Sequence, residues 1–270
     1  MNRERGFALL IVLWSVVLLA LLVTGIAAAG RSDVQLAANL RGAAQAEAAA
    51  DGAVHAAAFH LLDPAAPWAA DGTPRMLDQP GGPPGARVLL RIEDEAGKVN
   101  PNLASPELLQ ALLRQVGADA QTATRLAAAI VDWRFPGDAP RPNGAKAPQY
   151  QAAGLPYGPP NAPFESLAEL GAVLGMTPEL LARLAPSLSV LNDGEPDLRV
   201  AGAPVRAAIR QATGASPAAG GPTRPPRTVT ITAEAAVAGG SRFSRRATIR
   251  LGGTPREPLM QVLTWEAVDG

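Results

Sequence analysis

Residues 3–29 read RERGFALLIVLWSVVLLALLVTGIAAA, and this stretch decides how the rest of the chain is placed. No charged residue occurs between Phe7 and Ala29. As a helix the run would be about 34 Å long, which is enough to cross a hydrocarbon core of about 30 Å. Arg3 and Arg5 precede the run, so the positive-inside rule keeps residues 1–6 in the cytoplasm and sends the remainder across.

Two simpler interpretations of this run remain open. The small residues Ala27–Ala29 could end a cleaved secretory signal peptide, or the run could be a plain single-pass anchor. The apolar part of a signal peptide usually has about 7–15 residues, and this run is longer. The junction also has one glycine, Gly6, directly before Phe7. This junction resembles the signal of type IV pilins and pseudopilins, which is cleaved after the glycine, and a residue without a side chain would let a peptidase approach the backbone.

The helix is expected to continue beyond the membrane as a stalk from residue 31 to Leu62, where Asp63–Pro64 stops it. Apolar residues at spacings of three, four or seven form one stripe along it. The stripe predicts that the outer half of the helix packs against a globular head. Its members are Leu36, Leu40, Ala43, Ala50, Val54, Ala57 and Leu61.

The remainder predicts an α+β fold with a large inserted α-helical domain. Residues 64–85 read as an irregular connection, and residues 86–94 as a strand in which Val88, Leu90 and Ile92 face one side. Helices are then expected over 105–116, 120–133, 166–175 and 177–184, with a Pro- and Gly-rich loop over 135–165. A further helix is expected over 203–212, followed by a low-complexity segment over 215–227. Three strands complete the chain, over 228–238, 242–251 and 259–267.

This order of elements gives four predicted parts: a leader (1–6), a transmembrane and stalk helix (7–62), a head with an antiparallel sheet (63–94 and 192–270), and the inserted helical domain (95–191). Arg242, Arg246 and Arg250 alternate along one expected strand with Arg245 opposite, which is typical of an edge strand protected from aggregation.

Composition argues against several functions. The formal net charge is zero, whereas nucleic-acid binders usually carry a basic excess. The absence of cysteine excludes disulfides, thiolate metal sites and thiol nucleophiles. The two histidines, His55 and His60, are five residues apart on the expected helix and do not share a face. We therefore expect a structural protein and not an enzyme.

Several blocks, in order, resemble one family. Behind Gly6–Phe7 come DEAGKVN at 94–100, DWR at 132–134, PYGPPNAPFES at 156–166 and VLTW at 262–265. The chain thereby resembles the K-type minor pseudopilins of bacterial type II secretion. Members usually lack the membrane glutamate of other pilins, and Ile11 stands at that position here.

The resemblance implies a set of functional expectations. A prepilin peptidase would cut between Gly6 and Phe7 and methylate Phe7. The mature protein would be a single-pass protein of the inner membrane with its head in the periplasm. It would form or initiate the tip of the pseudopilus, and its partners would be other minor pseudopilins and the inner-membrane secretion platform.

The resemblance also implies a calcium site in the inserted domain, with Asp132, Asp138 and Asn143 as ligands. Phe135 and Lys146 stand where the family often has carboxylates. A lost carboxylate weakens a site for a hard cation, so calcium remains an open expectation and no other cofactor is expected.

Two alternatives remain. Residues 100–109 resemble the start of helix-hairpin-helix modules in membrane-anchored DNA receptors, although the turn at 115–119 has one glycine and an acid. Nucleic acid is therefore an unlikely partner. Trp133, Tyr150, Tyr157 and Phe164 surround the 135–165 loop and would either form a recognition surface or pin the loop to the helical core, of which we favour the second.

Overall fold

The fold is that of a computed structural model, which describes residues 3–63, 65, 67–78, 85–214, 227–252 and 258–268. The side chains of residues 3–6, 8–9 and 26–32 are outside this description, although their backbone is helical. The predicted low-complexity segment at 215–227 lies outside the described residues except for Arg227. Residues 1–2 of the predicted leader also lie outside them.

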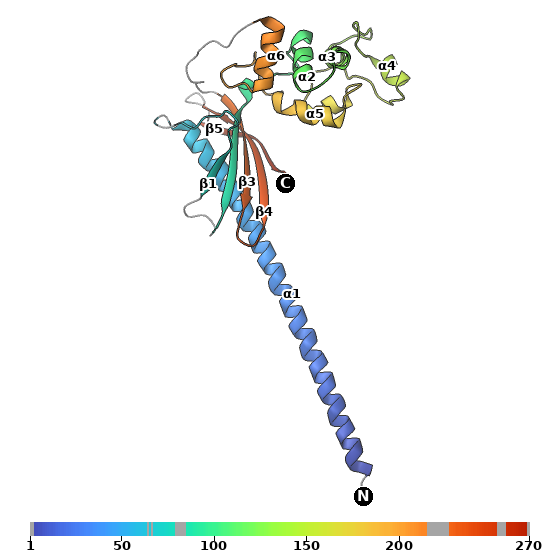
Figure 1. The fold of residues 1–270 in the computed structure, drawn as a ribbon, viewed down its shortest axis with the longest axis vertical. Coiled ribbons are helices and arrows are strands. Elements are labelled where there is room, and N and C mark those ends of the chain that lie inside the picture. The colour runs from blue at the N-terminus through green and yellow to red at the C-terminus, as the bar shows by residue number, and fades with distance from the viewer. Residues whose placement is uncertain are drawn as a thin grey trace.

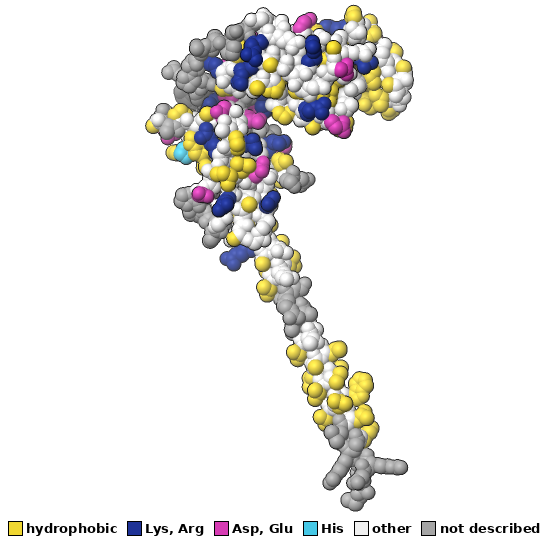
Figure 2. Space-filling view, viewed as in Figure 1, with side chains coloured by type: hydrophobic (Ala, Val, Ile, Leu, Met, Phe, Trp, Pro, Cys, Tyr) yellow, Lys and Arg dark blue, Asp and Glu magenta, His cyan; other side chains and the backbone are white. Residues whose placement is uncertain are grey.

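One helix, α1 (Arg3–Leu62), forms the long axis of the molecule (Figure 1). It ends at Leu62, as the Asp63–Pro64 pair predicts. The N-terminal half projects away from the rest of the protein, and its large apolar side chains from Leu10 to Val23 are exposed (Figure 2). Within the described parts of the chain, no helix satisfies the length and apolarity required of a membrane span.

The C-terminal half of α1 packs on the sheet mainly through small side chains. Alanines along one face are completely or almost completely buried: Ala46, Ala49, Ala50, Ala53 and Ala57. Their small size lets the helix backbone approach the strands closely. At Gly42 the helix lies close to the turn before β4, because a Cβ atom there would collide with Oγ of Ser241.

The sheet has five antiparallel strands in the order β1-β2-β3-β4-β5. They are β1 (Arg75–Asp78), β2 (Arg87–Asp94), β3 (Arg227–Ala236), β4 (Arg242–Leu251) and β5 (Met260–Val268). The inward-facing residues of β2 are Val88, Leu90 and Ile92, as the alternation predicts. Strand β1 was not predicted. It is a four-residue edge strand whose side chains are at most half-buried, so its sequence lacks a run of alternating buried residues.

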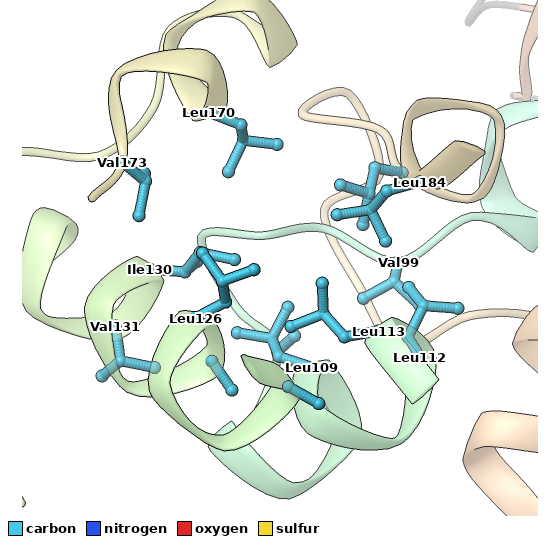
Figure 3. Close-up of a cluster of buried hydrophobic side chains, with 14 of the residues drawn as sticks. Val99, Leu109, Leu112, Leu113, Leu126, Ile130, Val131, Leu170, Val173 and Leu184 are labelled. Atoms are coloured by element: carbon cyan, nitrogen blue, oxygen red, sulfur yellow. The ribbon is translucent and has the colours of Figure 1, made fainter. Parts of the chain in front are cut away.

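Helices lie at the end of the sheet farthest from the N-terminus (Figure 1). They are α2 (Pro106–Gln115), α3 (Ala120–Arg134), α4 (Ala147–Ala152), α5 (Pro178–Leu184) and α6 (Ala203–Thr213), with 3-10 turns η1 (Glu95–Gly97), η2 (Leu167–Ala172) and η3 (Ala185–Ser187). We call this region, residues 95–214, the helical lobe. Its core includes Leu109, Leu113, Leu126, Ile130 and Leu184 (Figure 3).

Local signals set several of these boundaries. Ser105 accepts a hydrogen bond from the Leu108 N–H, and Thr177 accepts one from the Leu180 N–H, so both cap a helix that begins with proline. The helix predicted over 166–175 is instead the shorter 3-10 turn η2. The loop predicted over 135–165 contains the short helix α4. On α2 the buried leucines are Leu109, Leu112 and Leu113, whereas the predicted Leu108 is half-buried.

Helix α6 changes the expected limit of the helical lobe. Val205, Ala208 and Ile209 belong to the same buried cluster as the residues of α2 and α3. A separate cluster joins α1 to the sheet. The predicted boundary at residue 191 is therefore too early, because the chain beyond it returns to the lobe to complete its core.

The interpretation of Arg245 as part of an edge strand is wrong. Strand β4 lies between β3 and β5, and Arg245 points towards α1 with only 7% of its surface exposed. Its Nε lies 2.7 Å from Oδ1 of Asp51, and its Nη2 lies 2.8 Å from Oε1 of Glu47. The guanidinium also lies over the Trp265 ring, 5.3 Å from its centroid. Arg242, Arg246 and Arg250 are exposed.

We predict that Arg245→Met lowers the free energy of unfolding by about 1–3 kcal/mol. Breaking a fully buried ion pair costs about 3–5 kcal/mol, and the loss is smaller here because both carboxylates remain partly exposed. Urea unfolding of the intact chain in detergent micelles measures the change. Arg246→Met, the same substitution one residue away on the exposed side, is the control and should change stability by less than about 0.5 kcal/mol. Equal effects at both positions would contradict a role for the ion pairs.

Candidate functional site

The predicted processing site lies at the free end of α1. The backbone is helical through Gly6 and Phe7, and the Phe7 side chain is exposed. No other element contacts this end in Figure 1. Cleavage after Gly6 and methylation of Phe7 remain predictions.

Where the sheet meets the helical lobe, a charged network surrounds Lys98. Nζ of Lys98 lies 2.9 Å from Oε2 of Glu93 and 2.9 Å from Oε1 of Glu95. Glu95 is buried and also accepts a hydrogen bond of 2.6 Å from the Thr230 hydroxyl on β3. Burial opposes the charge on Lys98, but the two carboxylates outweigh it and raise the pKa of Lys98. The network therefore attaches the first turn of the lobe to the middle of the sheet.

Asp94, the last residue of β2, stabilises the turn that enters the lobe. Its Oδ1 accepts the N–H of Ala96 and thereby caps η1. Its Oδ2 is buried without a hydrogen-bond partner among the described residues, 3.9 Å from Nη1 of Arg227. Burial raises the pKa of Asp94, against the opposing effects of the Ala96 N–H and of Arg227.

Two buried asparagines tie the lobe's entry segment to its exit segment. Asn100 Nδ2 donates to the Asn192 carbonyl at 2.8 Å, and Asn192 Nδ2 donates to the Lys98 carbonyl at 2.7 Å. A parallel bridge between Val99 and Leu188 runs alongside. These asparagines were not predicted as functional. Their roles depend on pairing across about ninety residues, which a local pattern does not show.

We predict that Lys98→Met lowers the free energy of unfolding by about 3 kcal/mol at pH 7, because it leaves the buried Glu95 carboxylate without its cation. The folded-state pKa of Lys98 is raised above the ordinary 10.5, so its stabilisation is fully present below that value and is lost as the pH rises through the folded-state pKa. The stability gap between wild type and variant, measured by urea unfolding, should therefore be constant below pH 10.5 and shrink as the pH rises above it. A gap that stays constant with pH would contradict the assignment.

Three of the four aromatic side chains around the 135–165 loop belong to the core. Tyr150, Phe164 and Trp133 are buried, and the rings of Trp133 and Phe164 stack with their centroids 5.8 Å apart. The Tyr150 hydroxyl accepts the Leu174 N–H at 3.0 Å, and burial raises the pKa of Tyr150. Tyr157 alone is exposed. The interpretation that these rings pin the loop fits three of them.

The three predicted calcium ligands differ in their surroundings. Asp132 is buried, and its Oδ2 accepts the Arg141 N–H at 3.1 Å. Asp138 and Asn143 are exposed. No group of three or more histidine or acidic side chains in the described residues could hold a metal ion. The amine of Lys146 instead lies inside this region, bonded to the carbonyls of Asp132 and Phe135.

In the turn that could have bound DNA phosphates, the backbone N–H groups are already occupied by the carboxylate of Asp119. Asp119 caps α3 and accepts the N–H groups of Gln121 and Thr122, both at 2.9 Å. These hydrogen bonds lower the pKa of Asp119. A phosphate would need the same N–H groups and would meet a carboxylate there, so the geometry disfavours nucleic-acid binding.

The two histidines have separate packing roles. His60 stacks on Trp68 with ring centroids 4.2 Å apart, and His55 lies 5.5 Å from the Trp265 ring. They therefore contact different aromatic residues, as expected for histidines on different faces of α1.

Comparison with known proteins finds a family match that covers most of the helical lobe. Residues 89–193 match the family model described as type II secretion system (T2SS), protein K. Type II secretion system protein K of Pectobacterium carotovorum subsp. carotovorum is 31% identical over 85 residues, which cover 32% of this chain. That match spans only 26% of the relative's length.

The fold as a whole also has a solved counterpart. A chain in the crystal structure of the GspK-GspI-GspJ complex from the enterotoxigenic Escherichia coli type 2 secretion system superposes with a TM-score of 0.57 at 16% identity. The superposition covers 89% of this chain and 99% of that chain, so the likeness is one of overall fold. Residues 89–193 are thus similar to the type II secretion system protein K family, and the rest of the chain has a likeness in fold alone.

Proposed function

We propose that the protein is a minor pseudopilin of a type II secretion system, which forms or initiates the tip of the periplasmic pseudopilus during protein export. The observation that carries the proposal is a protein K domain placed at the far end of a long N-terminal helix. The full-length fold likeness to a chain of the GspK-GspI-GspJ complex supports it.

The lower half of α1 serves as the membrane anchor in this proposal. The run from Phe7 to Ala29 has no charge, and its described large side chains are apolar and exposed all round the helix. A helix that is apolar on every side and contacts no protein in the isolated chain suits a lipid environment. With Arg3 and Arg5 ahead of it, the helix would place the head in the periplasm of a bacterial inner membrane.

The helical lobe gives the protein its position in the filament. It lies beyond the sheet, at the end of the molecule opposite the N-terminus, and extends to one side (Figure 1). In a filament whose N-terminal helices bundle in parallel, another subunit stacked above would meet this lobe. The shape therefore favours the first position, with other minor pseudopilins below as partners. The prepilin peptidase and the inner-membrane secretion platform would be its further partners.

The intact mass and N-terminal sequence of the protein from its native membrane test the processing. We expect a mature chain that begins at Phe7 and is heavier by one methyl group. Gly6→Val should block the cleavage and leave the leader attached, because a β-branched side chain would obstruct the peptidase.

Other starting residues would exclude the proposal. A chain that begins at Gly30 would be an ordinary exported protein, and one that keeps the leader would be a plain anchor. The control is Gly25→Val, which places the same substitution in the same helix at a position where a Cβ meets nothing.

Assembly can be tested by photo-crosslinking, because the chain has no cysteine and a single introduced thiol is unique. Leu40 is exposed and apolar on the part of α1 just below the sheet, where a neighbouring pilin helix would pack. Leu40→Cys, labelled with a benzophenone maleimide in membranes, should give adducts with other minor pseudopilins. Arg114→Cys, on the exposed surface of the lobe, is the control and should give few. Equal adducts from both positions would contradict packing through the stalk.

A further inference from the structure

The long loop between α3 and η2 is organised around one buried amine. Lys146 is 3% exposed, and its Nζ lies 2.6 Å from the carbonyl oxygen of Asp132, 2.7 Å from that of Phe135 and 2.5 Å from Oδ1 of Asn161. An ammonium group has three N–H donors and no acceptor. The three oxygens therefore match its donors one for one.

The three oxygens come from separate parts of the chain, and the Lys146 amine contacts all of them. Asp132 and Phe135 lie at the C-terminal end of α3, Lys146 precedes α4, and Asn161 lies fifteen residues further on. Asn161 has a φ of 57°, a left-handed conformation that costs free energy for a residue with a side chain. The contact to Lys146 gives that conformation a function, because it fixes where the Asn161 side chain reaches.

The set of ligands has the chemistry of a site for a hard cation. All three atoms are oxygens, and two are main-chain carbonyls, which are ligands that calcium takes in proteins. Calcium also needs carboxylates and six to eight oxygens in total. The neighbouring carboxylate of Asp132 is engaged elsewhere, with the Arg141 N–H at 3.1 Å and the Arg141 Nε at 3.6 Å. The Arg141 guanidinium in turn lies over the Phe135 ring, 4.5 Å from its centroid.

We infer that the ammonium group of Lys146 is a covalently attached cation for this loop and takes the place of a bound divalent metal ion, so that the helical lobe folds without calcium. Two positive side chains, Lys146 and Arg141, occupy the oxygens that a metal would use. Lys146, in place of the carboxylate that the family resemblance led us to expect, is then a replacement of one cation by another. It is not the loss of a function.

Calcium dependence of thermal unfolding tests the inference on the intact chain in detergent micelles. The wild-type midpoint, Tm, should differ by less than about 1 °C between EDTA and about 5 mM calcium, because its oxygens are already satisfied. Lys146→Met keeps the length of the side chain but removes the cation. It should lower Tm by about 5 °C or more in either condition, since one buried and two partly buried oxygens lose their donor.

Lys146→Glu should convert the cage into a metal site. In EDTA its Tm should fall further than that of Lys146→Met, because a carboxylate would face three oxygens with no cation between them. Calcium at about 1–5 mM should restore much of the loss, and titration calorimetry should show one saturable site. Arg114→Glu is the matched control. It makes the same change of charge at an exposed position of the same lobe and should remain insensitive to calcium.

Three results would overturn the inference. The first is a wild-type Tm that rises by several degrees with calcium, which would mean that a metal is needed despite Lys146. The second is a Lys146→Met chain as stable as wild type, which would mean that the loop needs no cation. The third is a folded Lys146→Glu chain that ignores calcium. If Lys146→Glu does not fold, the wild-type and Lys146→Met measurements decide the matter alone.

Discussion

The contact between the upper half of α1 and the sheet is the constraint on which the rest of the structure depends. It is made by alanines, with Ala46, Ala50, Ala53 and Ala57 fully buried, against β2, β3 and β4. Small side chains bring the helix so close that added methyl groups would force backbone shifts, which cost about 1–3 kcal/mol each. Apolar contact is not directional, so on its own it would allow α1 to shift along its axis relative to the sheet. The ion pairs of Arg245 with Glu47 and Asp51 select one position along it.

The same strands that pack against α1 also determine the orientation of the helical lobe. It leaves the sheet at Asp94 and Lys98, and Thr230 holds Glu95 against the central strand. The lobe is therefore attached to the same strands that seat the helix. An assembly force acting on the long helix would be transmitted to the lobe through a short series of buried contacts, without a flexible connection at this entry point.

Local signals made much of the fold predictable. The caps Ser105 and Thr177, the alternation in β2 and the stop after Leu62 are each decided within a few residues. Strand β1 and helix α4 are too short to have a pattern of their own and exist because neighbouring segments pair or pack with them. The role of Arg245 depends on strand order, which no single strand discloses.

The candidate site, too, has features that the local sequence predicts and features that only the fold reveals. The Gly6–Phe7 junction is a local motif and could be found by inspection, as could the protein K blocks. The surroundings of Lys146 could not, since two of its three partners are main-chain carbonyls, which every residue has and only the fold brings together. From sequence the lysine reads as a repulsive charge in a loop expected to bind calcium. In the structure it is the group that the loop surrounds.

The arrangement of the sheet also determines the order in which the parts of the protein can fold. Helix α6 ends at Thr213, so every helix of the lobe is present before β3 begins at Arg227. Strand β2 must wait for a partner far along the chain, as the 135 residues between Glu95 and Thr230 illustrate. Contacts of such long range form slowly. During synthesis the lobe can thus complete its core while β2 has only β1 beside it, and the surface on which α1 packs is completed last.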